Sequence, residues 1–300
     1  MKTLRILIPC LLLAVPGCNL SENSDDDFKE INISEKTAHL IDAENKFGFD
    51  LFQHIYSSET EYENTMVSPL SVSLALAMTY NGARGETKTA MEKTLGVYGL
   101  TPDDINASYL SLVESLKSLD EKVLLEIANA IFYRTDFNVE NEFITTNKNY
   151  YDATVSALDF ANQQQALNTI NGWVKDKTHD KIESIINQIT PNNVMFLLNA
   201  IYFKGIWQKQ FNEKGTVKLP FKTGQGTIIE TETMQRTDTL PYVSNELFSA
   251  IELTYGKGNY NMYIFLPQNS RSLKEIIDMM NQSNWNRSEE HTSELQSLSH

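Results

Sequence analysis

The chain contains 300 residues, of which 41% are hydrophobic, and it carries a formal net charge of −14. This length is sufficient to bury a large core in one or two domains. The acidic excess argues against a nucleic-acid partner, because a phosphate-binding surface needs clustered Lys and Arg side chains.

Residues 1–18 have the pattern of an export signal. Lys2 and Arg5 give a positively charged start, and the apolar stretch at 6–15 is too short to span a bilayer. We therefore expect this segment to direct export of the protein and to be removed from the mature chain.

The end of this signal, LAVPGC, resembles the cleavage box of a bacterial lipoprotein. This resemblance implies a signal peptide over 1–17 and a lipid-modified Cys18 that attaches the mature protein to a membrane. The alternative is a plain secretory signal with an incidental cysteine. With Cys10 removed and Cys18 lipidated, no thiol remains for a disulfide, a cysteine nucleophile or a thiolate metal site.

Residues 18–36 are polar and charged, which predicts a flexible acidic tether between membrane and domain. Within it, SDDDF at 24–28 resembles the acidic signals that send some bacterial lipoproteins to the outer-membrane surface. An ordinary solvated linker explains the same residues.

Apolar residues recur at helical spacing through most of the first 180 residues. The helix that follows Ser68 is apolar on nearly every side, so we expect it in the interior. Ser68 is its expected N-cap, while Ser71 and Ser73 inside it need hydrogen-bond partners. The predicted helices cover 38–58, 69–82, 86–95, 102–119, 140–150 and 163–178, and short strands are predicted at 64–68 and 154–160.

Two long strands dominate the middle of the chain. The stretch NVMFLLNAIYFKGIW, residues 193–207, suits a strand buried on both faces, and at about 3.3 Å per residue it would extend about 50 Å. In the second strand, 123–137, the run NAIFYR starting at Asn129 echoes NAIYFK starting at Asn199. We expect these strands to be neighbours in one sheet, with both asparagines buried and hydrogen-bonded.

From residue 216 the pattern turns to strands separated by Gly and Asn turns. Helices followed by strands give an α+β fold class. The predicted strands are TVKLPF, GTIIETETM, TLPYVS, FSAIELTYG and NYNMYIFLP, and a final helix is predicted over 272–285.

The last segment, RSEEHTSELQSLSH at 287–300, has neither a helical nor a strand period. It resembles the translation of a sequencing-library adapter, so we interpret it as an artefact joined to a truncated gene. The alternative is a genuine divergent tail.

The inventory of chemical groups predicts no catalytic residue, no metal site and no cofactor. The chain has no His-Glu-x-x-His, no Gly-x-Ser-x-Gly and no phosphate-binding glycine loop. His39, His54 and His179 lie in predicted helices or at their ends without a nearby second ligand, which favours surface or structural roles.

Five segments together resemble the serpins, the suicide-type inhibitors of serine proteases, in the order and at about the spacing of that family. The resemblance implies a serpin-like α+β fold with a large mixed sheet, long central strands, further sheets and about eight helices, as a partial domain over 37–286. The segments are NTMVSPLSVSLALAMTYNGARGETKTAMEKTLG (64–96), IANAIFYRTDF (127–137), LNTINGWVKDKTHDKIESII (167–186), NVMFLLNAIYFKGIWQKQF (193–211) and IELTYGKGNYNMYIFLP (251–267).

In serpins an exposed loop near the C-terminus baits the protease, is cut, and inserts as a new strand between two long strands of the main sheet. The resemblance implies a serine protease, or a cysteine protease, as the partner of this protein. It also places Ser68, Ser71 and Asn199 under the middle of the sheet, where it parts, and Trp207 at the top, where the loop enters. The alternative for these residues is ordinary satisfaction of buried polar groups and core packing.

The chain departs from the family pattern after the helix at 272–285, where the C-terminal quarter, including the bait loop and the scissile bond, is missing. We therefore expect the chain as written to be inactive. For its parent, one hypothesis is a monomeric inhibitory serpin at a bacterial cell envelope. The other is a non-inhibitory serpin-fold surface protein with a binding or structural role. An enzyme is disfavoured because no catalytic constellation is found.

Overall fold

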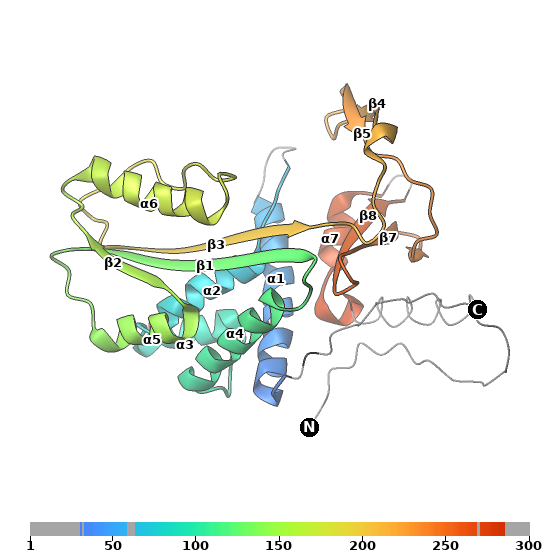
Figure 1. Ribbon diagram of the computed structural model, residues 1–300. Helices are drawn as coiled ribbons and strands as arrows, with labels where there is room; N and C mark the ends of the chain where they lie inside the picture. The colour runs from blue at the N-terminus through green and yellow to red at the C-terminus, as the bar shows by residue number, and fades with distance from the viewer. Residues whose placement is uncertain (1–30, 32, 59–63, 269–270, 286–300) are drawn as a thin grey trace, which may run out of the picture. The chain divides into compact units, whose positions relative to one another are not determined.

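The computed structural model describes residues 31, 33–58, 64–268 and 271–285 (Figure 1). The predicted signal peptide, Cys18 and residues 287–300 lie outside the described residues, as does most of the predicted tether. The described chain forms two compact units. The N-terminal unit comprises Ile33–Leu119 and Leu124–Lys204, and the C-terminal unit comprises Asp120–Val123 and the residues from Gly205 onward.

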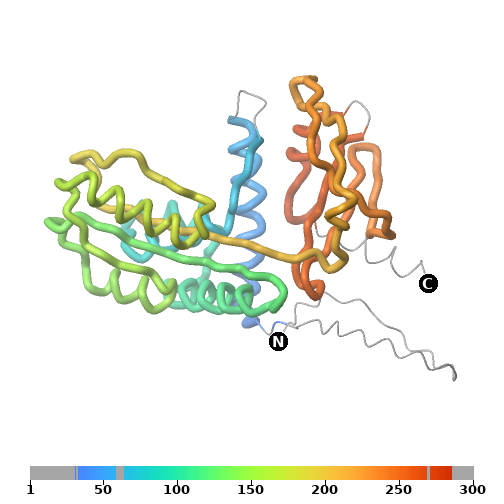
Figure 2. Tube along the Cα trace, turned by 45° about the horizontal axis from the view of Figure 1, so that its top comes forward, coloured from blue at the N-terminus to red at the C-terminus, as the bar shows by residue number. Residues whose placement is uncertain are grey.

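The N-terminal unit is a three-stranded sheet covered on both faces by helices. Helix α6 lies on one face, and the helices that precede it in the chain lie on the other (Figures 1 and 2). The strands are ordered β2-β1-β3. The elements are α1 (Glu35–Ser58), α2 (Pro69–Tyr80), α3 (Gly85–Leu95), α4 (Pro102–Lys117), β1 (Val123–Arg134), α5 (Asn141–Tyr151), β2 (Thr154–Leu158), α6 (Gln163–Lys177) and β3 (Met195–Gly205).

The two long strands are neighbours, as predicted, and the sheet is mixed. Strand β1 pairs with β2 in parallel, with Ala130 opposite Thr154. The N–H of Arg134, at the end of β1, donates to the carbonyl of Val194, just before β3, at 2.9 Å, so β1 and β3 run antiparallel. Both strands are shorter than the predicted ranges.

Alternate residues of β1 face opposite sides of the sheet and belong to separate cores. Ile127 and Ile131 pack in the cluster formed with α1 to α5. Phe132 points to the α6 side, where its ring meets Trp173 edge-on at 6.3 Å between centroids. This two-sided burial explains the near-continuous apolar pattern of the strand.

Local sequence signals set several helix ends. Thr101 caps α4 in a reciprocal capping box with Asp104, and α3 ends at Gly96, whose φ of 67° lies in the left-handed region. At α2, Ser68 occupies the N-cap position, but its side chain makes no capping bond. The predicted strand at 64–68 is wrong, because this segment has no regular secondary structure and belongs to none of the sheets of the described chain.

The predicted start of the domain also shifts slightly. Helix α1 begins at Glu35, so the last two residues of the predicted tether are helical. Lys36 in this first turn forms an ion pair with Asp104 of α4.

The C-terminal unit contains a two-stranded sheet, β4-β5, and a three-stranded antiparallel sheet, β6-β7-β8. Helix α7 packs on the face of the second sheet that carries Phe248, Ala250 and Phe265. The elements are β4 (Val217–Lys222), β5 (Ile228–Thr233), β6 (Tyr242–Ser244), β7 (Phe248–Tyr255), β8 (Tyr260–Pro267) and α7 (Leu273–Met279), with a 3₁₀ turn at Glu213–Gly215. The α+β class predicted from the element order is confirmed.

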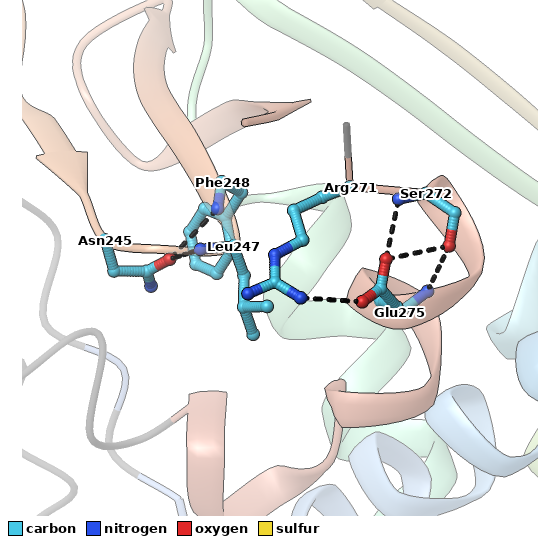
Figure 3. Close-up of polar contacts among 6 residues, drawn as sticks. All are labelled: Asn245, Leu247, Phe248, Arg271, Ser272 and Glu275. Atoms are coloured by element: carbon cyan, nitrogen blue, oxygen red, sulfur yellow. Dashed lines mark hydrogen bonds and ion pairs between the residues drawn. The ribbon is translucent and has the colours of Figure 1, made fainter. Parts of the chain in front are cut away.

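Three polar side chains shape the approaches to β7 and α7 (Figure 3). The Asn245 side-chain oxygen accepts the N–H groups of Leu247 at 2.8 Å and Phe248 at 3.0 Å, which closes the turn into β7. Ser272 and Glu275 form a capping box at the start of α7. The predicted helix over 272–285 is interrupted, because the backbone at Met280 becomes extended after the first seven residues.

A buried carboxylate holds the turn between β7 and β8. Asp120 is 4% exposed and accepts the N–H groups of Lys122 at 2.9 Å and Lys257 at 2.6 Å. Burial opposes its ionisation, but these backbone donors hold the pKa of Asp120 below its ordinary value. Gly256 adopts a φ of 55°, and a Cβ at this position would lie 2.5 Å from the carboxylate, so a side chain here meets both backbone strain and a clash.

Candidate functional site

A continuous chain of polar side chains crosses the sheet of the N-terminal unit. The Ser71 hydroxyl donates to the Asn199 side-chain oxygen, and the Asn199 amide donates to the Asn129 oxygen at 2.8 Å. The Asn129 amide in turn donates to the backbone carbonyl of Tyr151 at 2.7 Å. Four elements, α2, β3, β1 and α5, are thereby linked through side chains that act as both donors and acceptors.

The two asparagines of this chain differ in exposure. Asn129 is 4% exposed, as predicted, whereas Asn199 is half-buried. The difference follows from the strand order, because β1 lies between two strands and β3 is at the edge of the sheet formed by the described residues. The prediction that both asparagines are buried is therefore wrong for Asn199.

The structure brings together two of the three residues predicted under the middle of the sheet. Ser71 and Asn199 are hydrogen-bonded, while Ser68 lies at the start of α2. The contact of Ser68 with that helix is through its backbone carbonyl, which accepts the Ser71 N–H at 3.1 Å.

A second polar cluster joins three helices below the sheet. Ser73 donates from α2 to one carboxylate oxygen of Glu44 at 2.5 Å, and Tyr109 donates from α4 to the other at 2.6 Å. Ser73 and Tyr109 are fully buried and Glu44 is 9% exposed. Sequence reasoning required a partner for Ser73 but missed Glu44, although this residue follows Leu40 and Ala43 on the buried face of α1.

The surroundings of Glu44 disfavour its charged form. Burial raises the pKa of the Glu44 carboxyl above its ordinary value, and the hydrogen bonds from Ser73 and Tyr109 only partly oppose this. Burial, together with the nearby Glu44 charge, also raises the pKa of the Tyr109 hydroxyl. The cluster therefore places a buried titratable carboxyl among α1, α2 and α4, the helices below the sheet.

Trp207, the fourth predicted site residue, belongs to the C-terminal unit. Its ring stacks on Tyr255 at 4.2 Å with an interplanar angle of 14°, and Phe211 meets it edge-on at 6.0 Å. The Gln208 N–H donates to the Thr254 carbonyl at 2.9 Å, which fixes the adjoining backbone to β7. Two aromatic rings therefore restrain Trp207, one stacked and one T-shaped.

The remaining polar residues offer positioning contacts. His179 has a left-handed backbone, contacts the Glu126 carboxylate through Nε2, and lies 4.3 Å from the Tyr202 ring centroid to centroid. In the part of the chain that the structure describes, no three His, Cys, Asp or Glu side chains group as a metal site. None of the described helices is long and apolar enough to cross a membrane.

Comparison with known proteins identifies relatives of the whole described domain. The family profile described as Serpin (serine protease inhibitor) matches residues 42–298. Iripin-2 of Ixodes ricinus is 33% identical over 249 residues, which are 81% of this chain and 62% of Iripin-2. A serpin-like protein of Methanosarcina mazei is 31% identical over 284 residues, 90% of this chain and 66% of that protein.

The solved structures agree with the sequence comparison. The thermophilic serpin tengpin in its latent state is 32% identical and superposes with a TM-score of 0.75, over 85% of this chain and 67% of tengpin. The chain spans less than two thirds of the length of Iripin-2 and of the M. mazei protein. Because the family profile covers most of the chain and the fold agrees, the chain belongs to the serpin family.

Proposed function

We propose that this chain is part of an inhibitory serpin that traps serine-type endopeptidases by inserting a cleaved loop beside β3. In this mechanism the protease serine attacks the scissile carbonyl of the loop and forms an acyl-enzyme. Insertion of the loop then distorts the protease before water hydrolyses the ester. A cysteine protease would form the equivalent thioester.

The observation that carries this proposal is the polar chain from Ser71 through Asn199 to Asn129. A sheet that accepts a new strand must open next to an existing edge, and its buried polar groups must exchange partners without being left unsatisfied. Asn199 is half-buried on the edge strand of the described sheet and already uses both its amide and its oxygen. An apolar residue at this position would offer no exchangeable bond.

The other predicted site residues receive roles within the same proposal. Ser68 starts the helix that presents Ser71 beneath the sheet. Trp207, which stacks on Tyr255, is proposed as the residue beside which the loop first enters. The scissile bond and the target specificity belong to the bait loop, for which none of the described residues is a candidate.

We further propose that the protein acts as a monomer at a bacterial cell envelope, anchored through lipid on Cys18. The pattern of residues 1–18 supports this location, and the acidic run at 24–28 supports presentation at the outer-membrane surface. A single acyl chain gives only marginal membrane binding, so stable anchoring requires more than one chain on the processed cysteine.

The test compares the 300-residue chain with the complete product of its gene. Both are mixed with a panel of serine and cysteine proteases, and covalent complexes are detected after boiling in detergent. We expect the complete protein to form such a complex with at least one protease and the 300-residue chain to form none. No complex from the complete protein with any protease would instead favour a non-inhibitory surface protein.

The role of Asn199 is tested in the complete protein. We expect Asn199→Ala to lower the fraction of protein that ends in the stable complex and to raise the fraction that is cleaved and released. Asn149→Ala, at an exposed position on α5, is the matched control and should leave the partition unchanged. An equal effect of the two substitutions would contradict the proposed role.

A further inference from the structure

Three charged groups close the base of the β4-β5 hairpin. Arg236 donates to the backbone carbonyl of Lys209 and pairs with Asp238 at 3.2 Å, and Lys209 also pairs with Asp238. Lys209 precedes β4, whereas Arg236 and Asp238 follow β5, so these contacts join the two ends of the hairpin.

Arg236 and Asp238 are far less exposed than the neighbouring strand β4. Every residue of β4 is exposed, yet the Arg236 and Asp238 side chains are each only 12% exposed. The hydrogen bond from Lys209 holds the pKa of Asp238 below its ordinary value, which keeps the carboxylate charged beside Arg236. A nearly buried ion pair is stable only with further partners, and here the guanidinium has three.

The third partner of the guanidinium is an aromatic ring. Arg236 lies over the face of Phe211 at 4.8 Å from its centroid, within the range of a cation–π interaction. Phe211 meets Trp207 edge-on, and Trp207 stacks on Tyr255. The contacts therefore form one series, from the ion pair through Phe211 to the indole.

We propose that Arg236 is a positioning residue for Trp207, acting through Phe211, and that Asp238 orients the guanidinium. Tyr255 stacks on one face of the indole, and Phe211 makes a T-shaped contact with it, while Arg236 lies over the face of the Phe211 ring. The role of Trp207 in loop insertion rests on the proposed function. The positioning of Trp207 by Arg236 does not, so either proposal can fail while the other holds.

The chain offers a spectroscopic test, because it contains three tryptophans. The full chain is labelled with 5-fluorotryptophan, and the Trp207 resonance in the ¹⁹F NMR spectrum is assigned by its loss in Trp207→Phe. We expect Arg236→Ala to shift or broaden the Trp207 resonance while those of Trp173 and Trp285 stay in place. Asp238→Asn should give a smaller change of the same kind.

Two further variants separate positioning from a general loss of structure. Arg236→Lys keeps the positive charge over Phe211 but cannot serve all three partners, so it should restore part of the wild-type resonance. Lys218→Ala removes an exposed ion pair with Glu232 on the same hairpin and should leave all three resonances unchanged.

The route through Phe211 is tested by a double-substitution cycle. In a Phe211→Leu background, replacing Arg236 by alanine should produce little further change at Trp207. An unshifted Trp207 resonance in Arg236→Ala, or equal shifts of all three tryptophan resonances, would overturn the proposal. The same holds if Arg236→Ala shifts the Trp207 resonance as much in the Phe211→Leu background as in the wild type. Failure of the complete protein to inhibit proteases, with the predicted resonance shifts present, would refute the proposed function alone.

Discussion

Replacing Glu44 tests whether the three-helix polar cluster stabilises the N-terminal unit. Glu44→Ala leaves the buried Tyr109 hydroxyl without its acceptor, whereas Ser73 keeps a second acceptor in the Leu70 carbonyl at 3.1 Å. One orphaned hydroxyl costs about 1–3 kcal/mol, and the loss of one buried methylene adds about 0.8 kcal/mol. We therefore expect a destabilisation of about 2–4 kcal/mol.

Glu44→Gln should behave differently because its amide can replace both contacts. The Gln oxygen can accept from Tyr109, while its nitrogen can donate to the Ser73 oxygen, whose hydroxyl then donates to Leu70. At neutral pH we expect the free energy of unfolding of this variant to match or exceed that of the wild type.

The pH dependence provides the sharper comparison. Because the folded-state pKa of Glu44 is raised, its contribution to stability is fully present below the ordinary carboxyl pKa and is lost as the pH rises through the raised value. The stability of Glu44→Gln relative to the wild type should therefore increase from acid to neutral pH.

Urea unfolding followed by circular dichroism across this pH range measures the effect, with the exposed Glu114→Gln on α4 as the control. A constant difference between Glu44→Gln and the wild type at all pH values, or a cost of Glu44→Ala no larger than that of the control, would refute the reasoning.

Four further perturbations address other parts of the chain. Asn129→Ala leaves the Asn199 amide without its acceptor, so we expect the free energy of unfolding measured in urea to fall by about 1–3 kcal/mol. An unchanged free energy of unfolding would mean that the polar chain is dispensable for stability. Gly256→Ala should cost at least about 1–3 kcal/mol, because it combines a positive φ with a clash against Asp120, and a thermal midpoint equal to that of the wild type would contradict this geometry. Asp120→Asn should have a lower free energy of unfolding than the wild type at neutral pH, and this difference should shrink as the pH falls. The lowered pKa of Asp120 gives stability that is present above the ordinary carboxyl pKa and is lost as the pH falls through the folded-state value. An equal difference at neutral and acid pH would contradict the assignment. Cys18→Ser should abolish lipid detected by mass spectrometry and release the protein from the membrane fraction, and retention of the variant in membranes without lipid would refute the anchor.

Periodicity was sufficient to predict most elements of the N-terminal unit. Five of its six helices begin within one residue of their predicted starts. Pro69 and Pro102 mark two of these starts, and Asn162 caps a third. The strand predicted over 123–137 was too long at its C-terminal end, and the strand predicted over 193–207 was too long at both ends. Their apolar composition continues into residues such as Ile206 and Trp207, which pack beside β7 instead of extending β3.

The candidate site was only partly accessible to sequence reasoning. The echo between the Asn129 and Asn199 segments predicted neighbouring strands, and an apolar helix containing Ser71 predicted a need for partners. Glu44 and Arg236 were missed because a charged residue in an amphipathic or exposed segment is normally solvated, so nothing local marks it as buried. Their partners, Tyr109 and Phe211, are separated from them by 65 and 25 positions along the chain.

The two polar clusters of the N-terminal unit suit different mechanical roles. The Glu44 cluster joins three helices through groups that are buried almost completely, so breaking it exposes a carboxyl and two hydroxyls to an apolar interior. The polar chain from Ser71 to Asn129 instead passes through Asn199, a half-buried residue of an edge strand. Its amide and hydroxyl groups can exchange one neutral partner for another at little net cost, since a hydrogen bond replaced by an equivalent one changes stability by about 1 kcal/mol or less.

This contrast locates the part of the unit best suited to move. A sheet that opens on a rigid base needs fixed contacts below it and replaceable contacts at its edge. Glu44 with its two hydroxyl partners satisfies the first requirement, and Asn199 between Ser71 and Asn129 satisfies the second. The proposed insertion beside β3 would therefore disturb the weaker, exchangeable cluster and leave the helical base intact.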